Sequence, residues 1–368
     1  MKPKTVVLTL GCLMSLICAQ SRAATVNDYA STADTIVIGR VTDRFEGPSG
    51  ASFDIAVEKI LKGSLPGQSV HVSHSWPRTG GIIIGDIPRR VNGQIRGIWF
   101  LQHTASSDWD ALVARSFPGV IGSIYWPVVE TLPAEYRYAA DASLADVLTF
   151  EFAAGLEVAG NPTEMIGATG PLNTPALQSV FAHWLGSQKV AFQAAGLAGM
   201  LNGGQQDAIP QLARLWPTIA ADQSRHYVLS ALRNSFRDST PSSVQQLAKL
   251  ADASATSTEL RKAAIWALAS IHTSESLPFL ATLLMSSDPG EQGRGVSGLS
   301  SFANGCPSQT PENVKSLDYL QFKNPSPYRN AETMANFAIP VNNLPGDPKL
   351  LQLVSFWTAW WEQHPELH

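Results

Sequence analysis

ELRKAAIWALASIH, which covers 259–272, and LPFLATLL, which covers 277–284, carry the clearest structural pattern in this chain. In both stretches apolar residues recur at spacings of three and four, which is the period of a helix with one apolar face. The sequence therefore predicts two helices that follow one another closely along the chain.

The same pattern repeats on both sides of these stretches. One series of predicted helices has separations of 35 and 33 residues and comprises 208–215, 243–250 and 276–283, aligned on Leu212, Leu247 and Leu280. A second series lies between them, with separations of 36 and 31 residues, and comprises 227–234, 263–270 and 295–302, aligned on Leu232, Leu268 and Leu299. Two interleaved series with one period indicate a helix-pair repeat, and 190–201 is predicted as an earlier member.

The stretches 259–272 and 277–284 closely resemble the HEAT-repeat family, including its short bacterial form. The resemblance covers about 130 residues and implies an α-α solenoid in which each helix pair contacts its neighbours. HEAT-like repeats also occur in bilin lyases, but the export signal and the β domain predicted below depart from that family, so its activity is not expected here. Small residues are expected where the paired helices cross: Ala194, Ala195, Ala231, Ala263, Ala264, Ala267 and Gly298.

The first half of the chain has the two-residue period of β-strands instead. Turn residues separate five β-rich runs, 34–43, 52–58, 68–74, 95–101 and 120–125. Short strands at this spacing predict a small barrel or sandwich. The pieces Gly39-x-Val41, VEKILKG (57–63) and WFL (99–101) resemble OB-like domains of secreted bacterial proteins, of the netrin-like and protease-inhibitor type. This resemblance implies an OB-like barrel of roughly 100 residues.

The predicted fold is therefore multidomain, with a small N-terminal antiparallel β-barrel (OB-like) followed by a C-terminal α-α solenoid of HEAT-type repeats. Residues 151–174 are rich in glycine and proline and carry three charges, which predicts a linker with at most one short helix. The expected organisation is a signal peptide at 1–23, a β-barrel-like domain at 24–150, this linker at 151–174, HEAT-like repeats at 175–305, and a C-terminal extension with a capping helix at 306–368.

The capping helix is predicted from the apolar residues of the segment 349–364. Six of them lie three and four residues apart: Leu350, Leu353, Val354, Trp357, Trp360 and Trp361. One broad apolar helical face results. We expect this face to close the open end of the solenoid.

The first residues have the features of a secretory signal peptide. Lys2 and Lys4 precede a 15-residue apolar run, 5–19, and small residues follow near Ala23. The run is shorter than the roughly 20 residues of a membrane span, so we expect an exported chain, periplasmic or extracellular, without stable membrane insertion. Cleavage there removes three of the 26 basic and none of the 30 acidic residues, which leaves a net charge of −7 and disfavours nucleic acid as a partner.

The residues that could carry chemistry do not form a catalytic or metal-binding pattern. His71 and His74 lie three apart in a predicted strand and so point to opposite faces. Cys306, the single cysteine left after cleavage, lies in a predicted turn, as a passive residue or as a reactive thiol. GEQGRG (290–295) imitates part of a phosphate loop and is predicted to be the turn between two repeat helices. No catalytic residue, cofactor or metal is therefore predicted.

The predicted function is binding of another protein through the solenoid surface. Ile265 and Trp266 occupy slots where the resembled family usually carries polar residues, and exposed apolar residues mark contact sites. Four arginines are expected to ring them: Arg225, Arg233, Arg237 and Arg261. The alternative is that Trp266 packs against its neighbouring repeat and the arginines are solvated. The alternative function is a hydrolase or an enzyme accessory subunit with a site between the β domain and the solenoid.

Overall fold

The computed structural model of this chain describes residues 30–47, 50–75, 96–103, 109–111, 125–127, 129, 131–160, 162–163, 165–166, 174–205, 207–234, 240–252, 257–309, 319, 321–338 and 346–368. The expected signal peptide, 1–23, lies outside these residues. The chain divides into two compact units, and the boundary falls within helix α5 (Pro175–Leu185), between Val180 and Phe181.

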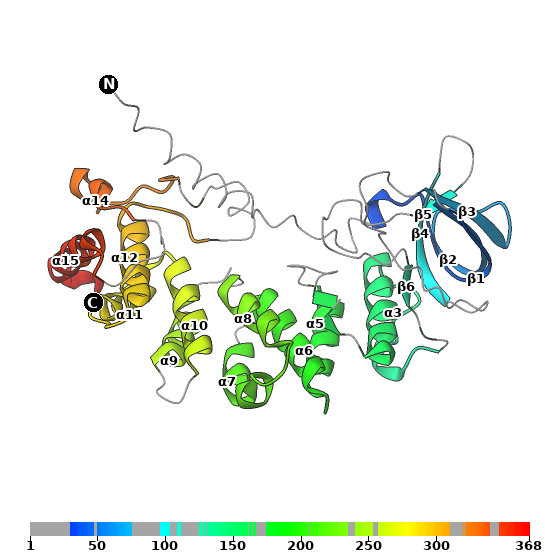
Figure 1. The fold of residues 1–368 in the computed structure, drawn as a ribbon, viewed down its shortest axis with the longest axis horizontal. Helices are drawn as coiled ribbons and strands as arrows, with labels where there is room; N and C mark the ends of the chain where they lie inside the picture. Colours follow the sequence, from blue (N-terminus) through cyan, green and yellow to red (C-terminus); the bar gives the residue numbers. More distant parts are fainter. Residues whose placement is uncertain are drawn as a thin grey trace, which may run out of the picture. The chain divides into compact units, whose positions relative to one another are not determined.

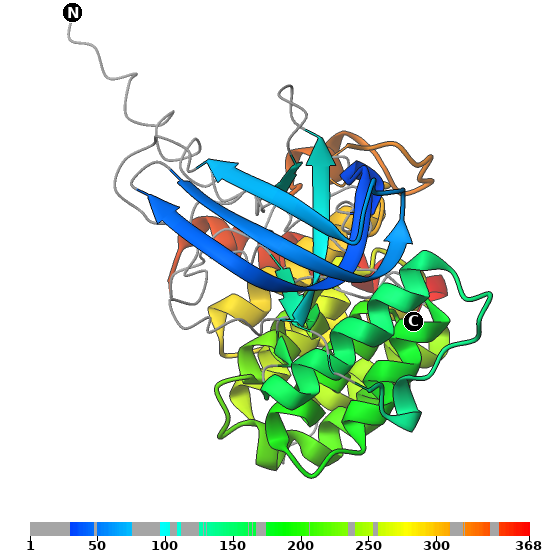
Figure 2. The same cartoon turned by 90° about the vertical axis from the view of Figure 1, so that its right-hand side faces the viewer.

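The N-terminal unit contains an antiparallel half-barrel sheet. Strand β1 (Thr35–Gly47) pairs antiparallel with β2 (Gly50–Lys62) and with β4 (Arg96–His103), and β2 pairs antiparallel with β3 (Ser69–Ser75). Figure 2 shows β1 and β2 in blue as long, curved ribbons. The four strands expected at 34–43, 52–58, 68–74 and 95–101 are therefore present.

The pairing of β1 with β2 shifts register between Ile38 and Gly39, which pair with Lys59 and Val57. A Cβ atom on Gly39 would lie 2.6 Å from the carbonyl oxygen of Ala56, so glycine allows the two strands to approach this closely. The indole Nε1 of Trp99, on β4, donates to the carbonyl oxygen of Gly39 at 3.1 Å. This bond links β4 to β1 at the register shift.

Two short strands complete the sheet. β5 (Trp109–Ala111) pairs antiparallel with β4 and parallel with β3, through Trp109 and Val72. The sequence did not predict β5, because three residues are too few to show a period. β6 (Tyr125–Pro127) pairs with β4 and begins at the last residue of the fifth expected strand, whose other residues lie outside the description.

Eight residues from five strands form the core on the inner face of the sheet: Val37, Val41, Ile55, Val70, Val72, Trp99, Leu101 and Trp109. On the opposite face of β1 and β4, Ile36, Ile38, Ile98 and Phe100 are buried as well. Both faces of these two strands are therefore apolar.

Helix α3 (Leu144–Ala159) shows that the expected linker began too early. The helix starts at the N-cap Ser143 and ends at Gly160, which has a positive φ of 73°. Its residues Phe152 and Leu156 are buried, and the carboxylate of Glu151 accepts from the Tyr138 hydroxyl at 2.8 Å. Residues 151–159 therefore belong to the folded N-terminal unit, because an apolar helical face outweighs the local glycine content.

The second unit is mostly helical (Figure 1). Its main helices are α6 (Val190–Asn202), α7 (Ala208–Ile219), α8 (Arg225–Asn234), α9 (Pro241–Asp252), α10 (Thr258–Ser270), α11 (Leu277–Leu283) and α12 (Pro289–Ala303). Each helix expected in the range 190–302 is thus present. Helices α6, α8, α10 and α12 pack in succession against one another, while α7, α9 and α11 pack against α6, α10 and α12 respectively.

Small residues allow the close packing of these helices. All six alanines expected at the helix crossings are at most 3% exposed. A Cβ atom on Gly295 would lie 2.7 Å from the carbonyl oxygen of Leu280, and one on Gly298 would lie 2.4 Å from the Leu280 side chain. Because α12 spans Pro289–Ala303, Gly295 lies inside a helix, and the turn expected at 290–295 is wrong. A helix interior tolerates glycine where another backbone approaches closely.

The last helix, α15 (Pro348–Glu362), packs against α12. Its buried face comprises Leu350, Leu353, Trp357 and Trp360, whereas Val354 and Trp361 are partly exposed. The indole Nε1 of Trp357 donates to the carbonyl oxygen of Asn336 at 3.0 Å, next to the short helix α14 (Ala331–Ala335). Among the described helices, none is long and apolar enough to cross a membrane.

Candidate functional site

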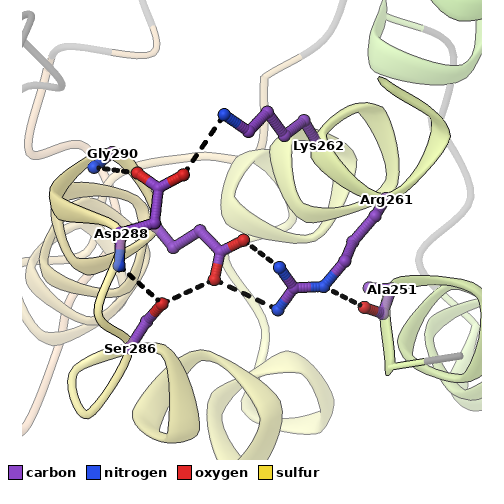
Figure 3. A network of polar contacts seen from close by, with 7 residues as sticks. Ala251, Arg261, Lys262, Ser286, Asp288 and Gly290 are labelled. Carbon is purple, nitrogen blue, oxygen red and sulfur yellow. Dashed lines mark hydrogen bonds and ion pairs between the residues drawn. The ribbon is translucent and has the colours of Figure 1, made fainter. Parts of the chain in front are cut away.

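The candidate site lies on α8, α10 and α12. Figure 3 shows a network of polar contacts that joins α10 to its neighbours through Arg261 and Lys262. Glu291 of α12 has a side chain only 5% exposed, and both of its oxygens face the guanidinium of Arg261 on α10. Ser286 donates to Glu291 Oε2 at 2.7 Å, and Arg261 Nε donates to the carbonyl oxygen of Ala251 at 2.8 Å. Arg261, which was expected to ring Ile265 and Trp266, thus pairs with a buried carboxylate and joins α9, α10 and α12.

A second ion pair lies beside this network. Asp288 caps α12 by accepting from the backbone N–H of Gly290 at 2.8 Å, and it pairs with Lys262 of α10 at 3.2 Å. Partial burial by itself would raise the pKa of the Asp288 carboxyl, but these two contacts together hold that pKa below its usual range. Lys262 and Asp288 therefore pair with each other and hold α10 against α12.

Ile265 and Trp266 lie on different faces of α10. Ile265 is 2% exposed, and therefore the expectation that it forms part of a contact surface is wrong. Helix α10 packs against α8, α9 and α12, so only a narrow strip of it reaches solvent. Trp266 lies on this strip one turn after Lys262 and is 37% exposed.

Two guanidinium groups lie over the ring of Trp266. The Cζ atom of Arg294, on α12, is 3.4 Å from the centroid of a ring of Trp266, and the Cζ atom of Arg233, on α8, is 6.0 Å away. Burial and the neighbouring Arg233 charge lower the pKa of Arg294 to about 10. Three helices therefore bring two cations and one indole together, and we call Arg233, Trp266 and Arg294 the Arg–Trp–Arg cluster.

The remaining predicted arginines lie elsewhere. Arg225 is exposed and faces Glu259 of α10 at 3.8 Å, as a surface ion pair. Arg237 lies outside the described residues. Of the six residues predicted for partner binding, Arg233 and Trp266 are thus the two that the structure brings together in the cluster.

Arg294 is the cluster residue that the sequence analysis missed. It lies within GEQGRG, whose glycines favoured a turn over a helix. Arg294 immediately precedes the predicted helix 295–302, so extending that helix by one residue towards the N-terminus would have included it. The contact itself depends on the approach of α10 to α12, which the sequence does not show.

Cys306 and His71, which were considered for other chemistry, and the buried His272 have protein groups as neighbours. Cys306 is 2% exposed, and burial raises the pKa of its thiol to about 11. His272 Nδ1 lies 2.7 Å from the carbonyl oxygen of Pro307, and burial lowers the pKa of its imidazole. His71 pairs with Asp54 at 2.6 Å. Within the described part of the chain, no group of three or more His, Cys, Asp or Glu residues is placed to hold a metal ion.

Comparison of the chain with models of protein families, with curated proteins and with solved structures finds no match.

Proposed function

We propose that this chain is an exported, non-enzymatic protein that binds another protein through the surface of α8, α10 and α12. The observation that carries the proposal is the placement of Trp266, an aromatic side chain left 37% exposed on a helix whose neighbouring positions are buried. Tryptophan and arginine are the residue types most enriched at the energetic centres of protein interfaces. The Arg–Trp–Arg cluster presents both types on one surface.

The proposal also includes the fold type of each unit. Helices α6–α12 constitute a HEAT-type solenoid, with α15 as its cap, and the half-barrel is an OB-like domain. The succession of α6, α8, α10 and α12 and the small residues between them support the solenoid. The pairing of β1 with both β2 and β4 supports the OB-like domain.

Capture from a cell-envelope extract tests the binding surface. The immobilised chain, Trp266→Ala and Leu351→Ala are compared by mass spectrometry of the retained proteins. Leu351 is the control because it is also an exposed apolar side chain, at 56%, but lies on α15. We expect a protein that is retained by the unchanged chain and by Leu351→Ala and lost with Trp266→Ala. An identical set of proteins on all three contradicts the proposed surface.

Export is tested separately. The Lys-flanked apolar run and the small residues after it predict cleavage near Ala23. N-terminal sequencing of the protein recovered from outside the cytoplasm should begin close to residue 24. A recovered chain that starts at Met1 rules out this cleavage.

A further inference from the structure

The cations of α8, α10 and α12 fall into two groups. Arg225, Arg261 and Lys262 each face a carboxylate, those of Glu259, Glu291 and Asp288 respectively. In the described structure, the guanidinium groups of Arg233 and Arg294 have no carboxylate partner and meet the ring of Trp266 instead. Among the described residues, the cluster therefore holds two like charges together without a counter-charge.

The stacking on Trp266 leaves the hydrogen-bonding capacity of Arg294 available. A guanidinium that lies 3.4 Å above a ring contacts it through its face, whereas its N–H donors lie in its own plane. Such a planar fork matches the two oxygens of a carboxylate. Arg294 is thus held in place by the indole, and none of the described residues accepts a hydrogen bond from its donors.

The electrostatics of the cluster favour an anion as well. Arg294 is partly buried, and Arg233 repels it, so both effects disfavour its charged form and lower its pKa. A bound carboxylate would offset the repulsion and replace the missing solvation. The chain has a net charge of −4, so a large polyanion such as nucleic acid meets overall repulsion, whereas a single acidic side chain does not.

We propose that the Arg–Trp–Arg cluster is a carboxylate-binding subsite that receives an acidic side chain, aspartate or glutamate, of the protein partner. The inference rests on the proposed function, because it names the chemistry that the partner presents to this surface. In it, Arg294 provides the bidentate contact, Arg233 adds a second cation, and the indole of Trp266 supports Arg294 and packs against the stem of the acidic side chain.

The test uses the chain labelled with 5-fluorotryptophan, in which Trp266→Phe identifies the ¹⁹F signal of Trp266. The probe is hexaglutamate with blocked ends, and hexaglutamine and inorganic phosphate are the comparison ligands. We expect hexaglutamate to shift the Trp266 signal saturably, hexaglutamine to leave it in place, and phosphate to act only at higher concentration. Added salt should weaken the hexaglutamate effect, because the contact is between charges.

Three variants assign the effect to the cluster. Arg294→Gln should weaken hexaglutamate binding at least about tenfold, and Arg233→Gln should weaken it about threefold, because the first removes the bidentate contact. Arg225→Gln is the matched control on α8 and should bind as the unchanged chain does. Circular dichroism checks that each variant is folded. If Arg294→Gln does not fold, Arg233→Gln still decides the test, because Arg233 is exposed and its replacement should leave the fold intact.

Three results would overturn the carboxylate subsite: an equal shift with hexaglutamine, a lower saturating concentration for phosphate, or unchanged binding by both Arg294→Gln and Arg233→Gln. These results are distinguishable from failure of the proposed function. If Trp266→Ala loses the captured protein but hexaglutamate does not bind, the surface stands and only the carboxylate chemistry is wrong. If hexaglutamate binds while capture is unaffected by Trp266→Ala, the proposed protein-binding surface is wrong.

Discussion

Among single residues, Glu291 shows what a buried carboxylate requires in this chain. Its oxygens accept from Arg261 and from Ser286, and these bonds compensate for the loss of solvation. Arg261 itself remains partly exposed, with 38% of its side chain accessible, so the pair lies at the edge of the helical packing. The carboxylate is the member of the pair that depends more on its partner.

Removal of Arg261 should therefore destabilise the chain. We expect Arg261→Met to lower the free energy of unfolding by about 2 kcal/mol, less than for a fully buried pair, because solvent screens the exposed arginine. Urea unfolding followed by circular dichroism measures this change. The double variant Arg261→Met with Glu291→Leu should recover part of the loss, since it no longer leaves a charge without its partner.

The matched control is Arg225→Met. Arg225 and Glu259 are both exposed and 3.8 Å apart, so their ion pair should contribute less than about 0.5 kcal/mol. A loss of stability as large as that of Arg261→Met would contradict the distinction between these two arginines.

Burial of Cys306 should suppress the reactivity of its thiol. The raised pKa, about 11, keeps the thiol protonated at pH 8, and the thiolate is the reactive form. In the chain 24–368, where Cys306 is the only cysteine, a thiol reagent at pH 8 should react at least about tenfold more slowly than with the urea-unfolded chain. Equal rates in the two states would contradict a buried, passive thiol.

The same shift gives stability a pH dependence. Because the folded state holds the proton of Cys306 more tightly than the unfolded state, ionisation of the unfolded thiol lowers stability as the pH rises from its ordinary pKa, near 8.5, towards the folded value of about 11. Comparison with Cys306→Ala isolates this contribution from that of the other groups that titrate in this range.

Among the individual elements, α15 packs against α12 and buries two tryptophans. Trp357 is fully buried, Trp360 is 5% exposed, and their ring centroids lie 5.3 Å apart. Tyr328 meets Trp360 edge to face at 5.8 Å, so the segment before α14 takes part in the same packing. The packing of α15 therefore involves few, large aromatic side chains.

Truncation of Trp357 should be correspondingly costly. We expect Trp357→Ala to lower the free energy of unfolding by about 3 to 5 kcal/mol, because it removes a large ring and leaves a cavity. Removal of the chain from Pro348 onward should expose apolar surface of α12 and promote aggregation. Melting temperature and light scattering measure the two effects, and Leu351→Ala, at an exposed position on the same helix, is the control.

A monodisperse truncated chain with unchanged melting temperature would reject the role of α15 as a cap. In that case the partly exposed Trp361 and its neighbours are better explained as a contact site for a partner.

Over the molecule as a whole, helix α5 joins the two units. Its residues up to Val180 belong to the first unit, and those from Phe181 belong to the second. Trp184 meets Phe181 and Phe192 edge to face at 6.2 and 5.2 Å, so the second half of α5 shares an aromatic core with α6. A fragment that represents the second unit therefore needs this half of the helix.

We expect the fragment 175–368 to fold with a helical circular dichroism spectrum and a cooperative unfolding transition. The fragment 187–368, which lacks α5, should be less stable, because the burial of Phe181 and Trp184 contributes about 2 to 3 kcal/mol each. A fragment 175–368 without helical structure would contradict the division into two units.

Much of the fold was predictable because the signals are local. Apolar residues at helical spacing around Leu212, Leu247 and Leu280 indicate helices, and the two-residue alternation in β1 to β4 indicates strands. Each pattern is contained within a single element. Strand β5 and the extent of α3 were not predictable in this way. The first is too short to show a period, and the second is followed directly by a stretch rich in glycine and proline, 160–175, which favoured a linker.

The candidate site was also predictable only in part. The order of residues along the chain already places Trp266 among alanines on a predicted helix, and Arg233 and Arg261 on predicted helices. Helix packing was needed to establish that Ile265 is buried, that Arg261 belongs to Glu291, and that Arg294 stacks on Trp266. The physical reason is that these contacts join helices about 30 residues apart in the chain, and the rotation and approach of packed helices, which side-chain packing determines, decide which residues meet.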